Sequence, residues 1–159
     1  MKIVILTTHI LSGALVGAEI KNPFYVAVIS IIVHFLLDLF PHGDYLNKKS
    51  RLKDFWKVAI DLVIGFSLVA VIIFIRGGTS SNGLSIGNVA IGIIFSLLPD
   101  FTTFLYRYLN MEFLKPVKNF HESLHCYENG VPEREFRLKN NLWDILISLI
   151  SLIILISLH

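Results

Sequence analysis

The sequence predicts an all-α integral membrane protein: a bundle of about five transmembrane helices with an additional cytoplasmic helical segment. Apolar residues make up 54% of the 159 positions, and charged residues only 16%. The apolar residues are gathered in blocks that are each about as long as a bilayer is thick. Short polar connections rich in Gly, Pro, Lys or Arg separate these blocks, as expected for loops between membrane helices.

The expected membrane-spanning helices are residues 3–20, 24–40, 55–75, 84–106 and 142–158. The first carries Gly13 and Gly17, whose small-xxx-small spacing lets another helix approach closely. The last has no charged residue after Asp144 and is dominated by Leu and Ile, which is typical of a membrane anchor. Residues 107–141 mix charges of both signs with aromatic side chains, so they predict a cytoplasmic helical segment. We expect this segment to cap the candidate metal site described below.

The distribution of basic residues predicts the orientation in the membrane. Five of the 14 Lys and Arg residues lie between Pro41 and Lys57, and six lie between Arg107 and Lys139. Cytoplasmic loops carry such an excess, so we expect a plasma (inner) membrane protein with a cytoplasmic N-terminus and an external C-terminus. The net charge of +2, without a basic stripe, predicts no nucleic-acid partner. The single Cys126 excludes an internal disulfide and a cysteine-built zinc site.

Ionisable residues inside apolar helices are costly and therefore mark candidate functional positions. His34 and Asp38 are four residues apart, so a helix presents both on one face. With a rise of about 1.5 Å per residue, ionisable residues on four of the helices lie at a similar depth, about 10 Å from the cytoplasmic ends. His121 and His125, again four apart, follow in the cytoplasmic segment. The candidate metal ligands are therefore His9, His34, Asp38, Asp61, Asp100, His121 and His125.

Imidazole and carboxylate are the side chains that bind zinc and neighbouring first-row metals. The candidate set suits one or two divalent ions, with zinc as the first expectation, and a two-metal site would clamp a phosphoryl or acyl group. The stretch from His121 to His125 also spells H-E-x-x-H, a spacing in which the glutamate of zinc peptidases acts as general base. Glu122 is therefore the candidate catalytic residue.

Four short motifs together indicate a family resemblance. These are Thr8-His9, His34-xxx-Asp38, Leu98-Pro99-Asp100 and the paired histidines of the cytoplasmic segment. In them the chain resembles small inner-membrane metal-dependent hydrolases, which carry T-H, H-x-x-x-D, L-P-D and paired-His motifs on transmembrane helices. Here the H-x-x-x-D motif precedes L-P-D and the histidine pair comes last. The resemblance implies metal-assisted hydrolysis, and a lipid or small-molecule phosphoester substrate at the cytoplasmic leaflet fits the location.

Several of these residues also have a purely structural interpretation. His9 could form an interhelical hydrogen bond, because polar side chains often join membrane helices. Asp61 could pair with Lys57 one turn away, and Asp100 could belong to a helix kink at Pro99.

Two functional alternatives stay open beside the hydrolase. An intramembrane zinc metallopeptidase would use Glu122 between the paired histidines. A metal-ion or proton carrier would also place Asp and His inside the membrane. Against a carrier, the expected extracellular halves of the helices lack ionisable residues apart from Glu19.

Overall fold

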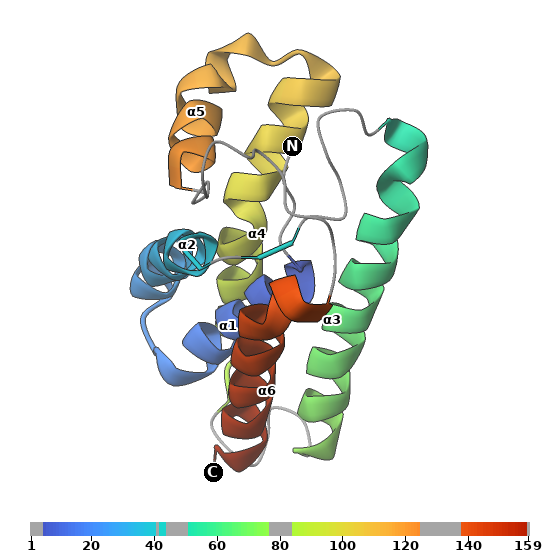
Figure 1. Ribbon diagram of the computed structural model, residues 1–159. Coiled ribbons are helices and arrows are strands. Elements are labelled where there is room, and N and C mark those ends of the chain that lie inside the picture. The colour runs from blue at the N-terminus through green and yellow to red at the C-terminus, as the bar shows by residue number, and fades with distance from the viewer. Residues whose placement is uncertain (1–4, 41, 44–50, 77–83, 125–137, 159) are drawn as a thin grey trace.

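The computed structural model describes residues 5–40, 42–43, 51–76, 84–124 and 138–158, and within them it contains helices and no strand. The α-helices of this part are α1 (Leu6–Glu19), α2 (Pro23–Asp38), α3 (Trp56–Ile75), α4 (Ile86–Leu109), α5 (Lys115–Leu124) and α6 (Leu142–Ser157) (Figure 1). Short 3₁₀ helices precede α3, α5 and α6, at Leu52–Phe55, Glu112–Leu114 and Leu138–Asn141. Each of the five apolar blocks holds one α-helix, and the expected helical segment contains α5, so the all-α prediction is confirmed.

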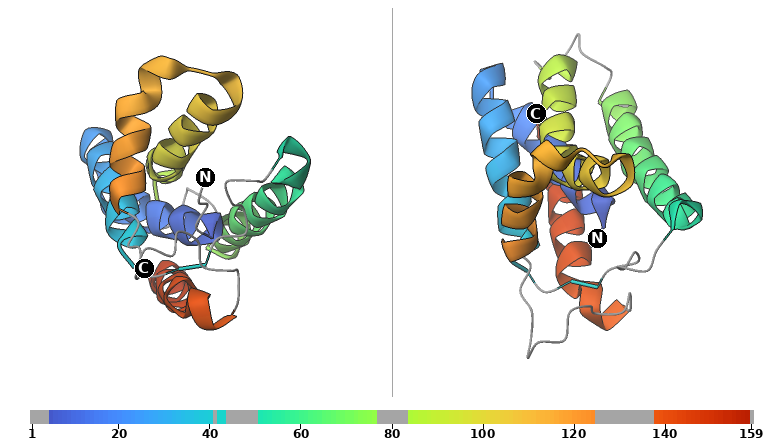
Figure 2. Two further views of the ribbon diagram at one scale, coloured as in Figure 1. Left: turned by 45° about the horizontal axis from the view of Figure 1, so that its top comes forward. Right: turned by 90° about the horizontal axis from the view of Figure 1, so that it is seen from above.

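α1 is the central helix of the fold. It contacts α2, α3, α4 and α6, and Figures 1 and 2 show it lying between them. Its buried apolar side chains, Ile10 and Ala14 among them, form one core cluster with Val69 of α3 and Ile93 of α4. Because other helices surround α1, a polar side chain such as His9 is also fully buried.

α1 and α4 approach each other at glycines. A methyl group added at Gly17 would lie 2.3 Å from the Asn88 carbonyl oxygen, and one at Gly13 would lie 2.5 Å from the Gly92 carbonyl oxygen. The Asn88 amide then donates a 2.8 Å hydrogen bond to the Ile20 carbonyl just after α1. The predicted close helix approach is confirmed, and α4 is the partner.

Two helical stretches, rather than the five expected, are long and apolar enough to cross a membrane: Leu52–Ile75 and Ile86–Leu109, each of 24 residues. α2 and α6 are apolar but only 16 residues long. At about 1.5 Å per residue they fall short of a hydrocarbon layer of about 30 Å. α2 is also seen almost end-on in Figure 1, where α3 and α4 run along the page, so it crosses them. Apolar composition predicted where these helices lie but not their length or direction.

A reversal of the chain after α4 brings α5 back beside it (Figure 1). Asn110 ends α4 in the left-handed conformation, with φ of 54°, which asparagine tolerates better than most residues. The described part of the expected cytoplasmic segment that follows α4, up to Leu124, therefore folds back onto the bundle. This return carries His121 to the same region as the polar residues of α2 and α4.

The distribution of side chains is inverted relative to that of a water-soluble protein. Among the described residues 16 buried side chains are polar or charged and 12 are apolar, whereas 31 large apolar side chains are exposed. On α2, Ile32 and Leu36 face outward while Ser30, His34 and Asp38 are buried. Soluble domains do the reverse with their ionisable residues. The fold thus gathers polar groups inside, and seven of the 16 belong to one cluster: His9, His34, Asp38, Ser96, Asp100, Thr103 and His121.

Candidate metal centre

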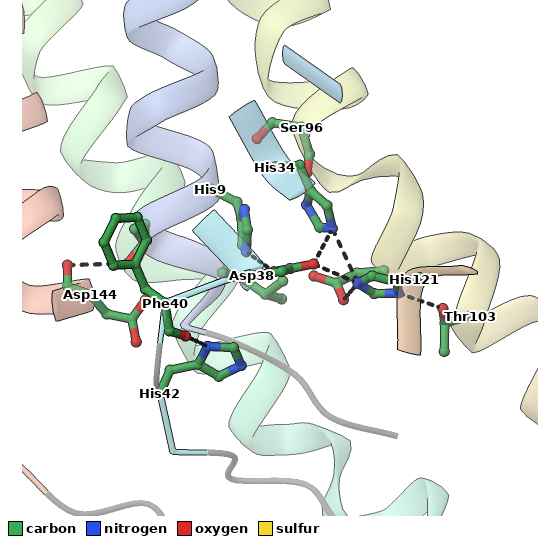
Figure 3. A network of polar contacts seen from close by, with 12 residues as sticks. His9, His34, Asp38, Phe40, His42, Ser96, Thr103, His121 and Asp144 are labelled. Carbon is green, nitrogen blue, oxygen red and sulfur yellow. Dashed lines mark hydrogen bonds and ion pairs between the residues drawn. The ribbon is translucent and has the colours of Figure 1, made fainter. Parts of the chain in front are cut away.

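Five of the seven predicted ligands converge on one buried site. His9 comes from α1, His34 and Asp38 from α2, Asp100 from α4 and His121 from α5; Figure 3 shows most of them together. Their exposed fractions are 0% for the first three, 6% for Asp100 and 1% for His121. Ligand atoms of His9, His34 and Asp100 lie within 4.8 Å of one another, as do those of His34, Asp38 and His121. The predicted convergence of separate helices is confirmed for these residues.

Asp38 lies at the middle of the site. Its Oδ2 is 3.1 Å from His34 Nε2 and 2.8 Å from His121 Nε2, and its Oδ1 is 3.5 Å from His9 Nε2 (Figure 3). The spacing of four residues on α2 puts His34 and Asp38 on one helix face, as the sequence predicted. One carboxylate therefore faces imidazoles from three helices.

The outward nitrogen of His34 is fixed by the backbone of α4. His34 Nδ1 lies 2.6 Å from the Ser96 carbonyl oxygen. A carbonyl can only accept, so Nδ1 carries the proton and donates. In the neutral ring, Nε2 then presents its lone pair to Asp38. Metal-binding histidines are oriented in this manner by a backbone carbonyl or carboxylate behind them.

His121 is held similarly by Thr103. The Thr103 hydroxyl lies 2.9 Å from His121 Nδ1 and donates a 3.2 Å hydrogen bond to the Pro99 carbonyl. A hydroxyl has one proton, so once it donates to Pro99 it accepts from His121 Nδ1–H. The lone pair of His121 Nε2 then faces inward, 3.3 Å from His34 Nε2.

This arrangement requires a cation. Two imidazole lone pairs and a carboxylate oxygen face one another at contact distance inside the protein, where like polar groups repel strongly. Either protons on the rings or a metal ion neutralises them. Nitrogen and carboxylate oxygen are the donors of zinc and related divalent ions, so the residues fit a metal.

His9 and Asp100 complete the ring of donors. Neither ring nitrogen of His9 makes a hydrogen bond within the described part of the chain, although its ring centroid lies 4.3 Å from that of His34. Asp100 Oδ1 is 3.7 Å from His121 Nε2, and Asp100 Oδ2 also lacks a hydrogen bond to the described residues. Buried polar atoms without partners are uncommon, and an ion is one of their explanations.

Asp61, predicted as a further ligand, belongs to neither group of converging donors. Its carboxylate accepts hydrogen bonds from the backbone N–H groups of Leu6 and Thr7 and a 2.6 Å bond from the Thr7 hydroxyl. The first N–H groups of a helix have no partner within the helix, and a carboxylate satisfies them well. The structure therefore places Asp61 as a tertiary cap at the start of α1.

The H-E-x-x-H pattern is only partly described. His125 lies outside the described residues. Glu122 is on α5, and its Oε2 pairs with Lys118 Nζ at 2.6 Å on a partly exposed face. The residue next to it, His121, turns into the site instead. Glu122, the predicted general base, therefore makes its ion pair on a different face of α5 from the one that carries His121.

Sequence reasoning missed Ser96 and Thr103, which orient the two histidines. A signal for Thr103 existed, because it follows Asp100 by three residues and so shares its helix face. The role of Ser96 belongs to its backbone carbonyl, and a residue type carries no signal for that.

Comparison of the chain with protein-family models, with curated proteins and with solved structures finds no match.

Proposed function

We propose that the protein is a membrane-embedded metal-dependent hydrolase. His34, Asp38 and His121 hold the divalent ion, and His9 and Asp100 complete its surroundings. The observation that carries the proposal is the orientation of the two histidines: each has its Nδ1 engaged behind it and its Nε2 directed at Asp38. The motif resemblance to inner-membrane hydrolases agrees with this assignment.

A membrane location is supported by the exposed surface. α3 and α4 have the length and composition of spanning helices, and the outward faces of α2 and α6 are apolar, with Ile32, Leu36, Leu149 and Ile153 each about half exposed or more. A hydrocarbon environment accepts such faces, whereas water does not. In this proposal α3 and α4 span the bilayer, and α1, α2 and α6 pack beside them. The excess of Lys and Arg between residues 41 and 57 and between residues 107 and 139 favours a cytoplasmic side for both of these segments.

A divalent cation bound in this site would polarise a phosphoryl or acyl oxygen of the substrate. The surrounding helices bury the ligands and keep bulk water away, which strengthens such electrostatic effects. Asp100 is the carboxylate best placed to accept a proton from an attacking water, because it borders the site and one of its oxygens makes no hydrogen bond to the described residues. Glu122 is less well placed because it pairs with Lys118.

Metal analysis tests the proposal. We expect protein purified in detergent to contain zinc or another first-row metal, and His34→Ala and His121→Ala to lose it. His42→Ala is the matched control, since His42 belongs to neither ligand group and its Nδ1 donates to the Phe40 carbonyl at 2.8 Å. Equal metal content in the wild type and both site variants would overturn the proposal.

Hydrolysis is tested separately, with bis(4-nitrophenyl) phosphate as the probe. We expect cleavage that is lost on chelation and restored by the metal found in the purified protein. If metal-loaded protein cleaves neither this diester nor 4-nitrophenyl esters, the proposed metal site is kept and the proposed hydrolase activity is rejected.

A further inference from the structure

A cavity of about 490 Å³ lies between α3, α4 and the start of α1. Its walls include Val58 and Leu62 from α3 and Leu97 and Phe101 from α4. α1 contacts α3 and α4 extensively, whereas α3 and α4 scarcely contact each other, which leaves this space between them. Its volume is within the range of about 300–1,000 Å³ that is usual for ligand pockets.

Asp100 is the single polar side chain among the residues that line the cavity. It is also a member of the candidate metal centre, with Oδ1 3.7 Å from His121 Nε2. The carboxyl group is buried, and its Oδ2 has no hydrogen-bond partner in the part of the chain that the structure describes. One side chain therefore joins an apolar cavity to the polar centre.

The lining determines which kind of molecule the cavity accepts. Water needs two to four polar partners to occupy a cavity favourably, and these walls offer one polar side chain, that of Asp100. An apolar molecule that binds there gains free energy because its surface leaves water, or because it makes closer van der Waals contacts with the walls than it had before binding. The outer face of α3 beside the cavity carries exposed Ile60, Val63 and Ile64, as in helices that contact hydrocarbon. The occupant available in such surroundings is a lipid chain.

We infer that the cavity binds the acyl chain of a membrane lipid and that the lipid's ester or phosphoester group lies at Asp100, beside the metal centre. This inference rests on the proposed hydrolase and names its substrate class. The reaction breaks a C–O or P–O bond of the lipid. Water supplies the hydroxyl that joins the carbonyl carbon or phosphorus, and its remaining proton passes to the leaving alkoxide.

Photolabelling tests the acyl-chain site. The probe is phosphatidylglycerol with a diazirine on its palmitoyl chain, present in trace amount in nanodiscs of phosphatidylcholine that hold the full chain. Its anionic head group suits a site that binds a cation. After illumination, peptide mapping is expected to show stronger labelling around Leu97 and Phe101 than on the outer face of α6 at Leu149 and Ile153.

Two variants of α3 form a matched pair. Val58→Trp fills the cavity and is expected to lower labelling of its walls about tenfold, because it excludes several methylene groups from their site. Ile60→Trp adds the same ring two residues away, at a half-exposed position that does not line the cavity, and is expected to leave labelling unchanged. Val58→Phe provides a smaller filling residue in case the tryptophan prevents folding.

Metal content measured on the same samples separates this inference from the proposed function. Two results in metal-loaded protein would overturn the acyl-chain site and leave the hydrolase proposal standing. The first is labelling of the cavity walls that is no stronger than labelling of α6. The second is labelling of the cavity walls that is equal in the wild type and the Val58 variants. Cavity labelling in protein that never contains metal supports the acyl-chain site and overturns the hydrolase. Cavity labelling in metal-loaded protein, lost on filling the cavity, supports both.

Discussion

Asp38 Oδ2 and His121 Nε2 lie 2.8 Å apart although 83 residues separate them in the chain. The contact joins the end of α2 to α5, and both side chains are buried. Thr103 engages the opposite ring nitrogen of His121, so the imidazole is held from both sides. A buried carboxylate and a buried imidazole held in this manner make the pair sensitive to small chemical changes.

Asp38→Asn is expected to abolish metal binding. The amide keeps the size of the carboxylate but removes the negative charge that faces three imidazoles. We expect metal affinity to fall by more than about 100-fold, beyond the 10- to 100-fold that loss of an outer-shell partner costs. The metal affinity is measured by competition between the protein and a metal-sensitive dye. An unchanged affinity would mean that Asp38 is only a hydrogen-bond acceptor for the histidines.

Thr103→Val is expected to weaken metal binding by about 10- to 100-fold without abolishing it. Valine has nearly the same shape as threonine but cannot accept from His121 Nδ1–H, so the ring loses the contact that fixes its tautomer and orientation. Thr103→Ser restores the hydroxyl and is expected to recover most of the affinity. If serine binds metal no better than valine, the hydroxyl has no part in orienting His121.

Asp61→Ala is expected to destabilise the fold and leave the bound metal in place. The substitution leaves the Leu6 and Thr7 N–H groups without their acceptor, whereas the Thr7 hydroxyl keeps the backbone carbonyl of residue 61 at 3.1 Å. Losing the acceptor of a part-buried donor costs about 1–3 kcal/mol. The measurements are a thermal unfolding midpoint in detergent and metal content at a temperature below it. Loss of metal from folded Asp61→Ala would return Asp61 to the set of ligands.

Gly17→Ala is expected to destabilise the contact between α1 and α4. The added methyl group would lie 2.3 Å from the Asn88 carbonyl oxygen and 2.6 Å from the Val89 Cα, so the backbones must separate. Such overpacking costs about 1–3 kcal/mol. Gly87→Ala on α4 is the control, because a methyl group there meets only the Ser85 hydroxyl at 3.8 Å. We expect it to be neutral or to stabilise the helix, and equal midpoints for the two variants would contradict the close approach.

Glu122→Gln separates the hydrolase from the metallopeptidase. We expect it to retain metal and diester cleavage, because Glu122 pairs with Lys118 on a partly exposed face. Asp100→Asn is expected to lose cleavage, because Asp100 is the carboxylate that borders the centre. Peptide cleavage that is abolished by Glu122→Gln while metal stays bound would favour the peptidase instead.

The sequence predicted the positions of the helices well, because apolar periodicity and turn residues act locally. It also predicted that His34 and Asp38 share a face, since four residues make about one helical turn. Gly13 and Gly17 marked a close helix contact without naming the partner, because small residues record only that something lies near. His9 and Asp100 were expected beside them because they are ionisable residues at a similar depth in apolar helices, which seldom contain such groups without a partner. His121 was expected there because it shares a helix face with His125 in the cytoplasmic segment.

What the sequence determined by itself was the helical composition, the helix positions and most of the donors of the candidate site. The tertiary structure decided which donors meet: Asp61 faces the start of α1, whereas the chain reverses at Asn110, after α4, so that α5 brings His121 to Asp38. It also decided that α2 crosses the other helices and that Thr103 and the Ser96 carbonyl orient the histidines. The physical reason is that helix periodicity fixes the direction of a side chain relative to its own helix, whereas its neighbours depend on how several helices pack at once.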